Sequence, residues 1–284
     1  MSQKFPNEDL FGTYAFTFKE LAQRAKKICS GISPRTSEWK GIVKKLTGFI
    51  DLTTLEGDDT NEKVKALCEK GQLSDAGLPD VAAVCIYPSL LDDAKNALRG
   101  TGIALASVAG GFPSGQTFVS VKCDEVQKAV GNGADEVDVV INRGMILEGR
   151  YEEVFKEVSK MKDAAGKAHL KVIIEISELG SVELIRKASE ICLLAGADFI
   201  KTSTGKSKHG ATPEGFLIMA DTAKEYYEKS GRKAGIKAAG GIRKVEDALC
   251  YYALVRETLG EDWLSAGLFR IGASSLLDSI IDWE

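Results

Sequence analysis

The sequence predicts an α/β fold, a TIM (β/α)8 barrel with extra N-terminal helices. Eight short apolar runs alternate with amphipathic helical patterns from about residue 48 to the end of the 284-residue chain. Several runs are apolar at successive positions, as in parallel strands covered on both faces. Eight such alternations with right-handed crossovers close a barrel. The alternative, an open doubly wound sheet, usually carries a glycine-rich turn after its first strand, where this chain has EGDDT.

The eight expected strands begin near residue 49 and recur to the end of the chain. They lie at 49–54, 81–87, 103–108, 135–142, 170–177, 197–203, 235–240 and 267–273. Helical patterns separate them, including 60–71, 181–197 and 212–231. The last has Pro213 in its first turn and Gly231 at its end, the usual start and stop signals of a helix.

Two regions are expected along the chain. Residues 1–47 form an N-terminal helical extension, with helical patterns at 7–32 and 36–48, that packs on the bottom or side of the barrel. Residues 48–284 form the barrel itself. No low-complexity segment or linker divides the chain.

Composition argues against several classes of function. The net charge of −4 gives no electrostatic footprint for nucleic acid or an anionic membrane. The N-terminus has no long apolar run, so we expect neither a signal peptide nor a membrane span. We therefore expect the protein to be cytoplasmic. The six cysteines are spread singly without a C-x-x-C pair, so we expect free thiols in a reducing compartment.

Two histidines argue against catalysis that relies on a histidine cluster or a histidine-rich metal site. Catalysis must then come from other side chains. Asp138 lies within a valine-rich strand, while Lys201 and Lys237 each follow the short start of a strand and precede glycine-containing sequence. Each alone has an ordinary interpretation as a strand-end surface residue. Three such groups converging on the mouth of one barrel favour an active site.

The predicted register brings the two lysines together. Lys237 would lie about 5 Å from Lys201 across the ladder between neighbouring strands. A second cation at that distance, together with burial, lowers the pKa of Lys201. An uncharged lysine amine attacks carbonyl carbon and forms a Schiff base. Asp138 could then transfer a proton, directly or through one water molecule.

Further polar residues follow the strands. Asp51, Thr53, Thr54 and Glu175 are open to a simpler interpretation as strand-end hydrogen-bonding groups. The positions after the last two strands hold AAGGIR (238–243) and RIGASSLLDS (270–279), and such loops bind phosphate in many TIM barrels. The sequence STGKS is not a nucleotide P-loop, because the required first glycine is Ile200.

Seven motifs together resemble the deoxyribose-phosphate aldolases, class I enzymes on a TIM barrel. They are DLTTLEGDDT, VCIYPS, GADEVDVVIN, LKVIIEISEL, GADFIKTSTGKS with GATPE, KAAGGIR and RIGASSLL, in that order over roughly residues 48–280. The resemblance implies reversible cleavage of 2-deoxy-D-ribose 5-phosphate to D-glyceraldehyde 3-phosphate and acetaldehyde. It also implies a small phosphorylated sugar as the substrate, a role in deoxyribonucleotide catabolism and no cofactor. A homodimer is our own mild expectation, because many such barrels pair through helices.

The resemblance also implies residue roles. Lys201 is similar to the Schiff-base lysine, Lys237 to the lysine that perturbs its pKa, and Asp138 to the proton-transfer carboxylate. The positions similar to phosphate-binding residues are Gly205, Gly240, Gly241, Ser274 and Ser275. The positions similar to those around the substrate hydroxyls are Asp51, Thr53 and Lys206. Cys85 matches a strand-two cysteine, which we interpret as buried packing.

The chain departs from the family at two places. Members commonly end in a tail with a terminal tyrosine, whereas this chain ends SIIDWE and has no tyrosine after Tyr252, so we expect reduced turnover. Glu56 stands where asparagine is common and adds an anion near the mouth. Two alternatives stay open: a barrel acting mainly as a binding or scaffolding protein, and a Schiff-base aldolase for another phosphorylated sugar.

Overall fold

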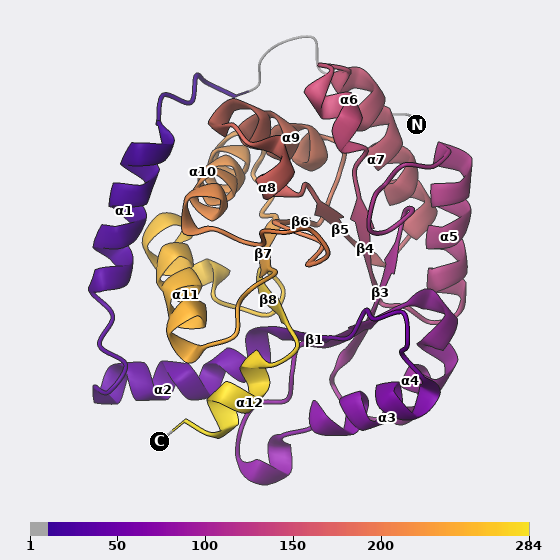
Figure 1. Cartoon of the computed structure of the whole chain (residues 1–284), viewed down its shortest axis with the longest axis vertical. Helices are drawn as coiled ribbons and strands as arrows, with labels where there is room; N and C mark the ends of the chain where they lie inside the picture. The colour runs from indigo at the N-terminus through magenta and orange to yellow at the C-terminus, as the bar shows by residue number, and fades with distance from the viewer. Residues whose placement is uncertain (1–10, 284) are drawn as a thin grey trace.

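Eight parallel strands close into a barrel in the computed structural model, which describes residues 11–283. Each strand is hydrogen-bonded to its successor, and β8 pairs with β1 (Figure 1). This confirms the predicted TIM barrel. The strands are β1 (Ile50–Thr53), β2 (Ala83–Ile86), β3 (Ala104–Ala109), β4 (Glu136–Val140), β5 (His169–Ile173), β6 (Phe199–Lys201), β7 (Gly235–Ala239) and β8 (Phe269–Ala273).

Strand β5 ends four residues before its predicted end at residue 177. Glu175 adopts a left-handed backbone conformation, with φ at 56°, which takes the chain out of the strand and into a short helix. A positive φ is uncommon for a residue with a side chain. The other predicted strands differ from the observed ones by a few residues at their ends.

Helices surround the strands. They are α1 (Phe18–Ser30), α2 (Ser37–Leu46), α3 (Asn61–Lys70), α4 (Leu91–Ala97), α5 (Val119–Gly131), α6 (Arg143–Leu147), α7 (Tyr151–Ala165), α8 (Ile176–Leu179), α9 (Val182–Leu194), α10 (Pro213–Ser230), α11 (Val245–Leu259) and α12 (Leu276–Ile281). Short 3-10 turns are η1 (Thr47–Phe49), η2 (Ser74–Ala76), η3 (Pro88–Leu90) and η4 (Glu261–Trp263). Among residues 11–283, no helix combines the length and apolar character that crossing a membrane requires.

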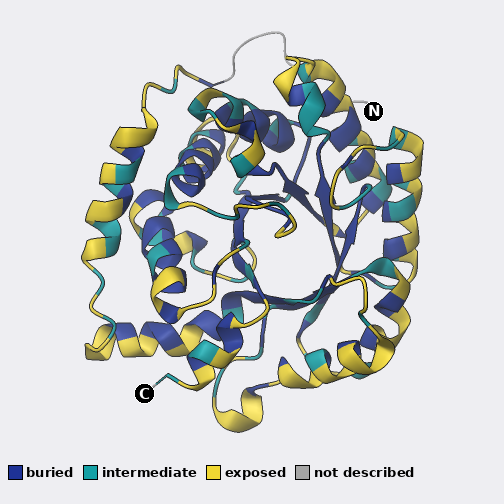
Figure 2. Cartoon of the chain, viewed as in Figure 1, coloured by how far each residue is buried: buried dark blue, intermediate teal, exposed yellow. Residues whose placement is uncertain are grey.

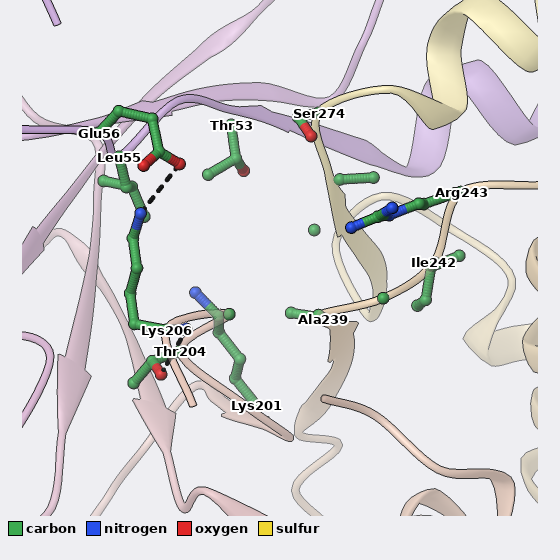
Figure 3. Close-up of a pocket in the computed structure, with 15 residues that line it drawn as sticks. Thr53, Leu55, Glu56, Lys201, Thr204, Lys206, Ala239, Ile242, Arg243 and Ser274 are labelled. Atoms are coloured by element: carbon green, nitrogen blue, oxygen red, sulfur yellow. Dashed lines mark hydrogen bonds and ion pairs between the residues drawn. The ribbon is translucent and has the colours of Figure 1, made fainter. Parts of the chain in front are cut away.

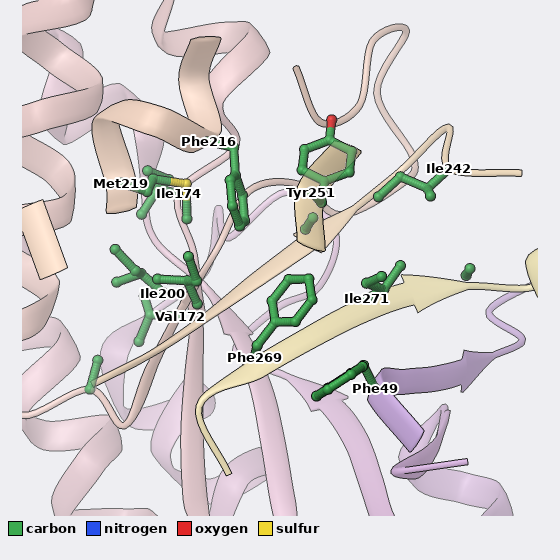
Figure 4. Close-up of a cluster of buried hydrophobic side chains, with 14 of the residues drawn as sticks. Phe49, Val172, Ile174, Ile200, Phe216, Met219, Ile242, Tyr251, Phe269 and Ile271 are labelled. Carbon is green, nitrogen blue, oxygen red and sulfur yellow. The ribbon is translucent and has the colours of Figure 1, made fainter. Parts of the chain in front are cut away.

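The main apolar core lies between the strands and the helices. Figure 2 shows the strands mostly buried, and the helices buried on the faces toward them. Figure 4 shows part of this layer, where the ring of Phe269 on β8 lies 5.4 Å from that of Phe49 and 6.4 Å from that of Phe216. Such aromatic pairs add to the stabilisation that comes from burial alone.

The interior of the barrel is divided into an apolar side and a charged side. Small apolar residues of β2 and β3, including Ala83, Cys85 and Ala106, fill one side. Cys85 is fully buried there, as expected. The other side holds charged residues from β1 and from β4 to β8, described below. Gly235 on β7 leaves space for the ring of Phe199, with which a Cβ atom would overlap.

The N-terminal helices pack against the late part of the barrel. Helix α1 contacts α10 and α11, and α2 contacts α11 and α12 (Figure 1). The helix predicted at 7–32 is too long: α1 begins only at Phe18, after a capping box formed by Thr17 and Glu20. Residues 7–10 lie outside the described part of the chain. Residues 12–17 form neither helix nor strand, and within them the hydroxyl of Tyr14 donates to Asp221 at 2.6 Å.

The prediction of six free thiols is wrong for one pair. Cys29 on α1 and Cys250 on α11 form a disulfide, with their Cα atoms 5.0 Å apart and 221 residues between them in sequence. The packing of α1 on α11 brings them together, and no spacing motif could indicate this. Among the described residues, the free cysteines are Cys68, Cys85, Cys123 and Cys192.

Candidate active site

Lys201 is the last residue of β6, where the strand leaves the barrel. Its Cα partner on β7 is Lys237, so the predicted pairing of the two lysines is confirmed. Both amines donate to the same carboxylate oxygen, Oδ2 of Asp138, at 2.7 Å from Lys201 Nζ and 2.8 Å from Lys237 Nζ. Three strands therefore bring these groups together inside the barrel.

A third lysine contacts the same carboxylate. Lys171 on β5 is the Cα partner of Asp138, and its Nζ lies 2.9 Å from Oδ1. Sequence reasoning missed this residue. The signal that identified Asp138, a charged residue within a run of β-branched residues, is equally present in LKVII.

Farther from the carboxyl ends of the strands, the ion pairs continue. Arg270 on β8 binds Oδ1 of Asp51 at 2.6 Å and Oε1 of Glu136 at 2.8 Å. Lys171 Nζ lies 2.6 Å from Oε2 of Glu136 and 3.2 Å from Oδ2 of Asp51. Lys237 also pairs with Asp51. Neither Arg270 nor Glu136 was predicted to belong to the site.

The three carboxylates of this network are held ionised. Burial would raise the pKa of Asp138, but Lys171, Lys201 and Lys237 hold it well below its usual range. Asp51 behaves likewise, because burial is outweighed by Lys171, Lys237 and Arg270. For Glu136, burial is outweighed by Lys171 and then by His169, whose Nδ1 lies 3.7 Å from Oε1, and its pKa falls to about 2.

The cationic groups divide into two kinds. Burial opposes the charge of Lys171 and Lys237, but adjacent carboxylates raise the pKa of each amine. Lys201 behaves differently. Burial is the largest influence and lowers its pKa, and Lys237 lowers it further against the attraction of Asp138. Of these lysines, Lys201 therefore loses its proton most readily.

A cavity of about 230 Å³ opens above this network (Figure 3). In the figure, the side chain of Lys201 projects into the cavity. Asp51, Asp138 and Lys237 are not among the residues that line it. The lining residues are Thr53, Leu55, Glu56, Lys201, Thr204, Gly205, Lys206, Ala239, Gly240, Gly241, Ile242, Arg243, Gly272, Ala273 and Ser274. The cavity lies at the carboxyl ends of the strands, where TIM-barrel enzymes carry their active sites.

Glycine and cationic residues define one side of the cavity. Gly205, Gly240 and Gly241 have φ values of 77°, 86° and 84°, in the region that glycine adopts readily. A Cβ atom on Gly240 would lie 2.9 Å from Cα of Gly210, so this position also has no space for a side chain. Arg243, absent from the sequence prediction, points into the cavity (Figure 3).

The two serines predicted near phosphate are separated by the structure. Ser274 lines the cavity, whereas Ser275 is exposed at the start of α12 and does not line it. Adjacent residues leaving a strand point in different directions, and the sequence could not show which of the two faces inward.

Asp51, which the resemblance places near the substrate hydroxyls, does not line the cavity. It is fully buried beneath the cavity, two positions before Thr53 on β1, and it binds Arg270 and Lys237. Thr53 lines the cavity, and its hydroxyl donates to the backbone oxygen of Asp51 at 2.7 Å. Residues two positions apart on a strand point to the same face, so both face the barrel interior, and the rise along the strand places Thr53 nearer the cavity.

Glu56 and Lys206 form an ion pair at the mouth of the cavity. Their charged atoms lie 2.9 Å apart, and the pair is visible in Figure 3 across the cavity from Arg243. The anion expected near the mouth is therefore present, and it is partly neutralised by Lys206. The side chain of Glu56 remains 62% exposed, so solvent screens the interaction.

Glu175 supports the loop that follows β6. It is buried and accepts hydrogen bonds from the backbone N–H and the hydroxyl of Thr204, which lines the cavity. This agrees with its interpretation as a hydrogen-bonding residue at a strand end. Within residues 11–283, no group of three or more His, Cys, Asp or Glu residues is arranged to hold a metal ion.

Comparisons with known proteins give a consistent result. A family model described as DeoC/LacD family aldolase matches residues 46–279. A deoxyribose-phosphate aldolase of Mus musculus is 44% identical over 276 residues, covering 92% of this chain and 86% of that protein.

Solved structures also resemble the chain. A putative deoxyribose-phosphate aldolase from Coccidioides immitis is 28% identical with a TM-score of 0.72, covering 94% of this chain and 98% of that one. A structure from Aeropyrum pernix, described as a unique tetrameric structure of deoxyribose phosphate aldolase, is 29% identical with a TM-score of 0.70, covering 94% and 99%.

Proposed function

This chain belongs to the DeoC/LacD family of aldolases, and we propose that it is a class I enzyme that reversibly cleaves 2-deoxy-D-ribose 5-phosphate. The products are D-glyceraldehyde 3-phosphate and acetaldehyde. One observation carries the proposal: Lys201 lines the cavity, has a lowered pKa and shares the carboxylate of Asp138 with Lys237.

Lys201 is the nucleophile of the proposed reaction. Its uncharged amine attacks the C1 aldehyde to give a carbinolamine, which loses water to form an imine. Asp138, 2.7 Å from the Lys201 amine, accepts and returns the protons of these steps. Lys237 keeps the Lys201 amine partly uncharged and keeps Asp138 ionised.

Carbon–carbon cleavage follows from the imine. The C3 hydroxyl loses its proton, the C2–C3 bond breaks, and its electron pair moves into the C1–C2 bond to give an enamine. Glyceraldehyde 3-phosphate leaves. Protonation at C2 regenerates an imine, and water hydrolyses it to acetaldehyde and the free Lys201 amine. The imine acts as the electron acceptor, so no further oxidant or reductant is required.

The phosphate group would bind at the glycine-rich side of the cavity. Backbone N–H groups of Gly205, Gly240 and Gly241 and the hydroxyl of Ser274 are suitable donors, and Arg243 supplies positive charge. Thr53 and Lys206 are available for the substrate hydroxyls. Ser275 would contribute only indirectly, through the first turn of α12.

Reductive trapping tests this proposal. Borohydride added with deoxyribose 5-phosphate is expected to fix the two-carbon or five-carbon unit on Lys201, as located by peptide mass spectrometry. Lys201→Leu should abolish both the adduct and turnover. Lys206→Met, which alters another lysine of the same cavity, is a matched control and should keep the adduct.

An adduct on a different lysine, or none, would contradict the proposal. An adduct on Lys201 without release of aldehyde would favour the alternative of a binding or scaffolding protein. Donor aldehydes and ketones compared side by side would distinguish the proposed substrate from another phosphorylated sugar.

We also propose that the chain acts in deoxyribonucleotide catabolism, in the cytoplasm, as a homodimer, with residues 1–47 as an accessory extension. The four free cysteines are typical of a reducing compartment, whereas a disulfide such as Cys29–Cys250 is more common in an oxidising one. The tetramer described for Aeropyrum pernix supports self-association but with a different number of subunits. Sedimentation equilibrium would measure the assembly, and cell fractionation the compartment.

A further inference from the structure

The interior of the barrel holds one more cationic side chain than carboxylates. All seven residues are at most 5% exposed. The four cationic residues are Lys171, Lys201, Lys237 and Arg270, and the three carboxylates are Asp51, Glu136 and Asp138. Four less three leaves a surplus of one positive charge. Uncompensated charge is costly when it is removed from water, so loss of one proton from this group balances it.

The pattern of contacts determines where that proton is lost. Lys171 contacts three carboxylates, and Lys237 and Arg270 contact two each. Lys201 contacts only Asp138 among the carboxylates of this network. It also lines the cavity, where its neutral amine is useful. The least compensated cation is therefore the proposed nucleophile.

We propose that Arg270 and Glu136 are positioning residues that set this charge balance: Arg270 favours the uncharged form of the proposed nucleophile, and Glu136 opposes it. The inference rests on the proposed function. Arg270 retains its proton at all relevant pH values, so it supplies one fixed positive charge. By occupying Oδ1 of Asp51 and both oxygens of Glu136, it leaves Asp138 to be shared by three amines.

The path from Arg270 to Lys201 consists of direct ion pairs. Arg270 contacts Asp51, Asp51 contacts Lys237, and Lys237 and Lys201 share Oδ2 of Asp138. The other charged or titratable groups facing this path are Cys85 on β2, Lys171 on β5, His169 at the start of β5, and Glu56, Lys206 and Arg243 around the cavity.

The test is the pH dependence of imine trapping in variants of the full chain. In Arg270→Met, three cations face three carboxylates, and Lys201 is expected to keep its proton. In a plot of trapping rate against pH, the rising limb should move to higher pH by about one unit, which makes the rate at pH 7 roughly tenfold lower. Arg270→Lys retains the charge and should stay within about half a unit of the wild-type limb.

A compensating variant separates charge from structure. Arg270→Met combined with Glu136→Gln gives three cations and two carboxylates, which restores the surplus of one. Its limb should return toward the wild-type position even though the ion pairs that Arg270 forms with Asp51 and Glu136, and that Glu136 forms with Lys171, are lost. Glu136→Gln alone leaves a surplus of two and should move the limb to lower pH or leave it unmoved. If Arg270→Met does not fold, this single variant and Arg270→Lys still decide the question.

Either of two results would overturn the inference. One is that the rising limb of Arg270→Lys, or of the double variant, moves to higher pH as far as that of Arg270→Met. The other is that the rising limb of Glu136→Gln alone moves to higher pH. Absence of a Lys201 adduct in the wild-type protein would instead count against the proposed function, so the two failures are distinguishable.

Discussion

At the scale of single residues, the site depends on a lysine whose charge is opposed by its surroundings. Lys201 is 3% exposed and shares one carboxylate oxygen with another amine. Burial and the adjacent cation act in the same direction, and both lower its pKa. An aldehyde that enters the cavity meets this amine before any other lysine of the network.

Glu56 leads to a separate prediction at this scale. Because it pairs with Lys206 at 2.9 Å, it reduces the positive charge available to a phosphorylated substrate. Glu56→Gln should lower KM about threefold with little change in kcat, a small effect because the pair is solvent-screened. Steady-state kinetics at low and high salt would measure it, and the difference should shrink at high salt.

Glu62→Gln is the matched control, since it removes an exposed carboxylate that does not line this cavity. Its KM should stay close to the wild-type value. A rise in KM for Glu56→Gln would show that the pair helps to hold the substrate, contrary to this account.

Sequence reasoning at this scale succeeded where charge and apolar context conflict within one strand. Asp138, Lys201 and Lys237 were found in that way, and the structure brings all three together. Lys171 carries the same signal and was overlooked. Arg270 and Glu136 are harder to detect, because each lies near the beginning of its strand and looks like a surface residue until the barrel closes around it.

At the scale of elements, the pairing of β6 with β7 positions the two lysines. Their register also pairs Phe199 with Gly235, at the opposite end of the same strands. Phe199 fits inside the barrel only because Gly235 has no side chain. The pairing of β6 with β7 thus sets both the contact of Phe199 with Gly235 inside the barrel and the pairing of Lys201 with Lys237 near the cavity.

Gly235→Ala tests this arrangement. The added methyl group would overlap the Phe199 ring, and overpacking of this kind costs about 1–3 kcal/mol. The free energy of unfolding, measured by urea denaturation, should fall by that amount. Gly41→Ala is the control: Gly41 is exposed within α2 with no neighbour within 4 Å of the added Cβ.

That control should raise the free energy of unfolding by roughly 0.5–1 kcal/mol, because alanine favours a helix interior over glycine. Equal stability of the two variants would mean that Phe199 moves aside without cost. In that case, β6 and β7 would not be held in register by this contact.

The positions of the eight strands could be predicted because each strand is a short run of mostly apolar residues, separated from the next by a helical pattern. The exact ends of the elements could not be predicted. Strand β5 ends before the left-handed Glu175, and helix α1 begins only at Phe18. The Cys29–Cys250 bond depends on how α1 packs on α11, which no local pattern encodes. Similarly, the direction in which Ser274 and Ser275 leave β8 required the structure.

At the scale of the whole molecule, charge inside the barrel links stability to pH. The pKa values of Asp51, Asp138 and Glu136 are lower in the folded chain than in the unfolded one. Groups with depressed folded pKa values stabilise the fold above their unfolded values of about 4, and this stabilisation is lost as the pH falls toward the folded values.

Acid should therefore weaken the fold in a defined range. For Glu136, the drop from 4.5 to about 2 corresponds to roughly 3 kcal/mol, lost between about pH 4 and pH 2. Urea denaturation between pH 6 and pH 3 would measure the decline, and Glu136→Gln should show a shallower one. A free energy of unfolding that stays constant down to pH 3 would contradict the charge network described above.

The most direct test of the central claim is the titration of individual lysines by NMR, with ¹³C in the ε position of every lysine. The Lys201 signal, identified by its absence in Lys201→Leu, should titrate with a midpoint below the ordinary lysine value of 10.5. Signals of Lys171 and Lys237 should remain those of charged amines beyond that value. A Lys201 midpoint at or above 10.5 would contradict the account.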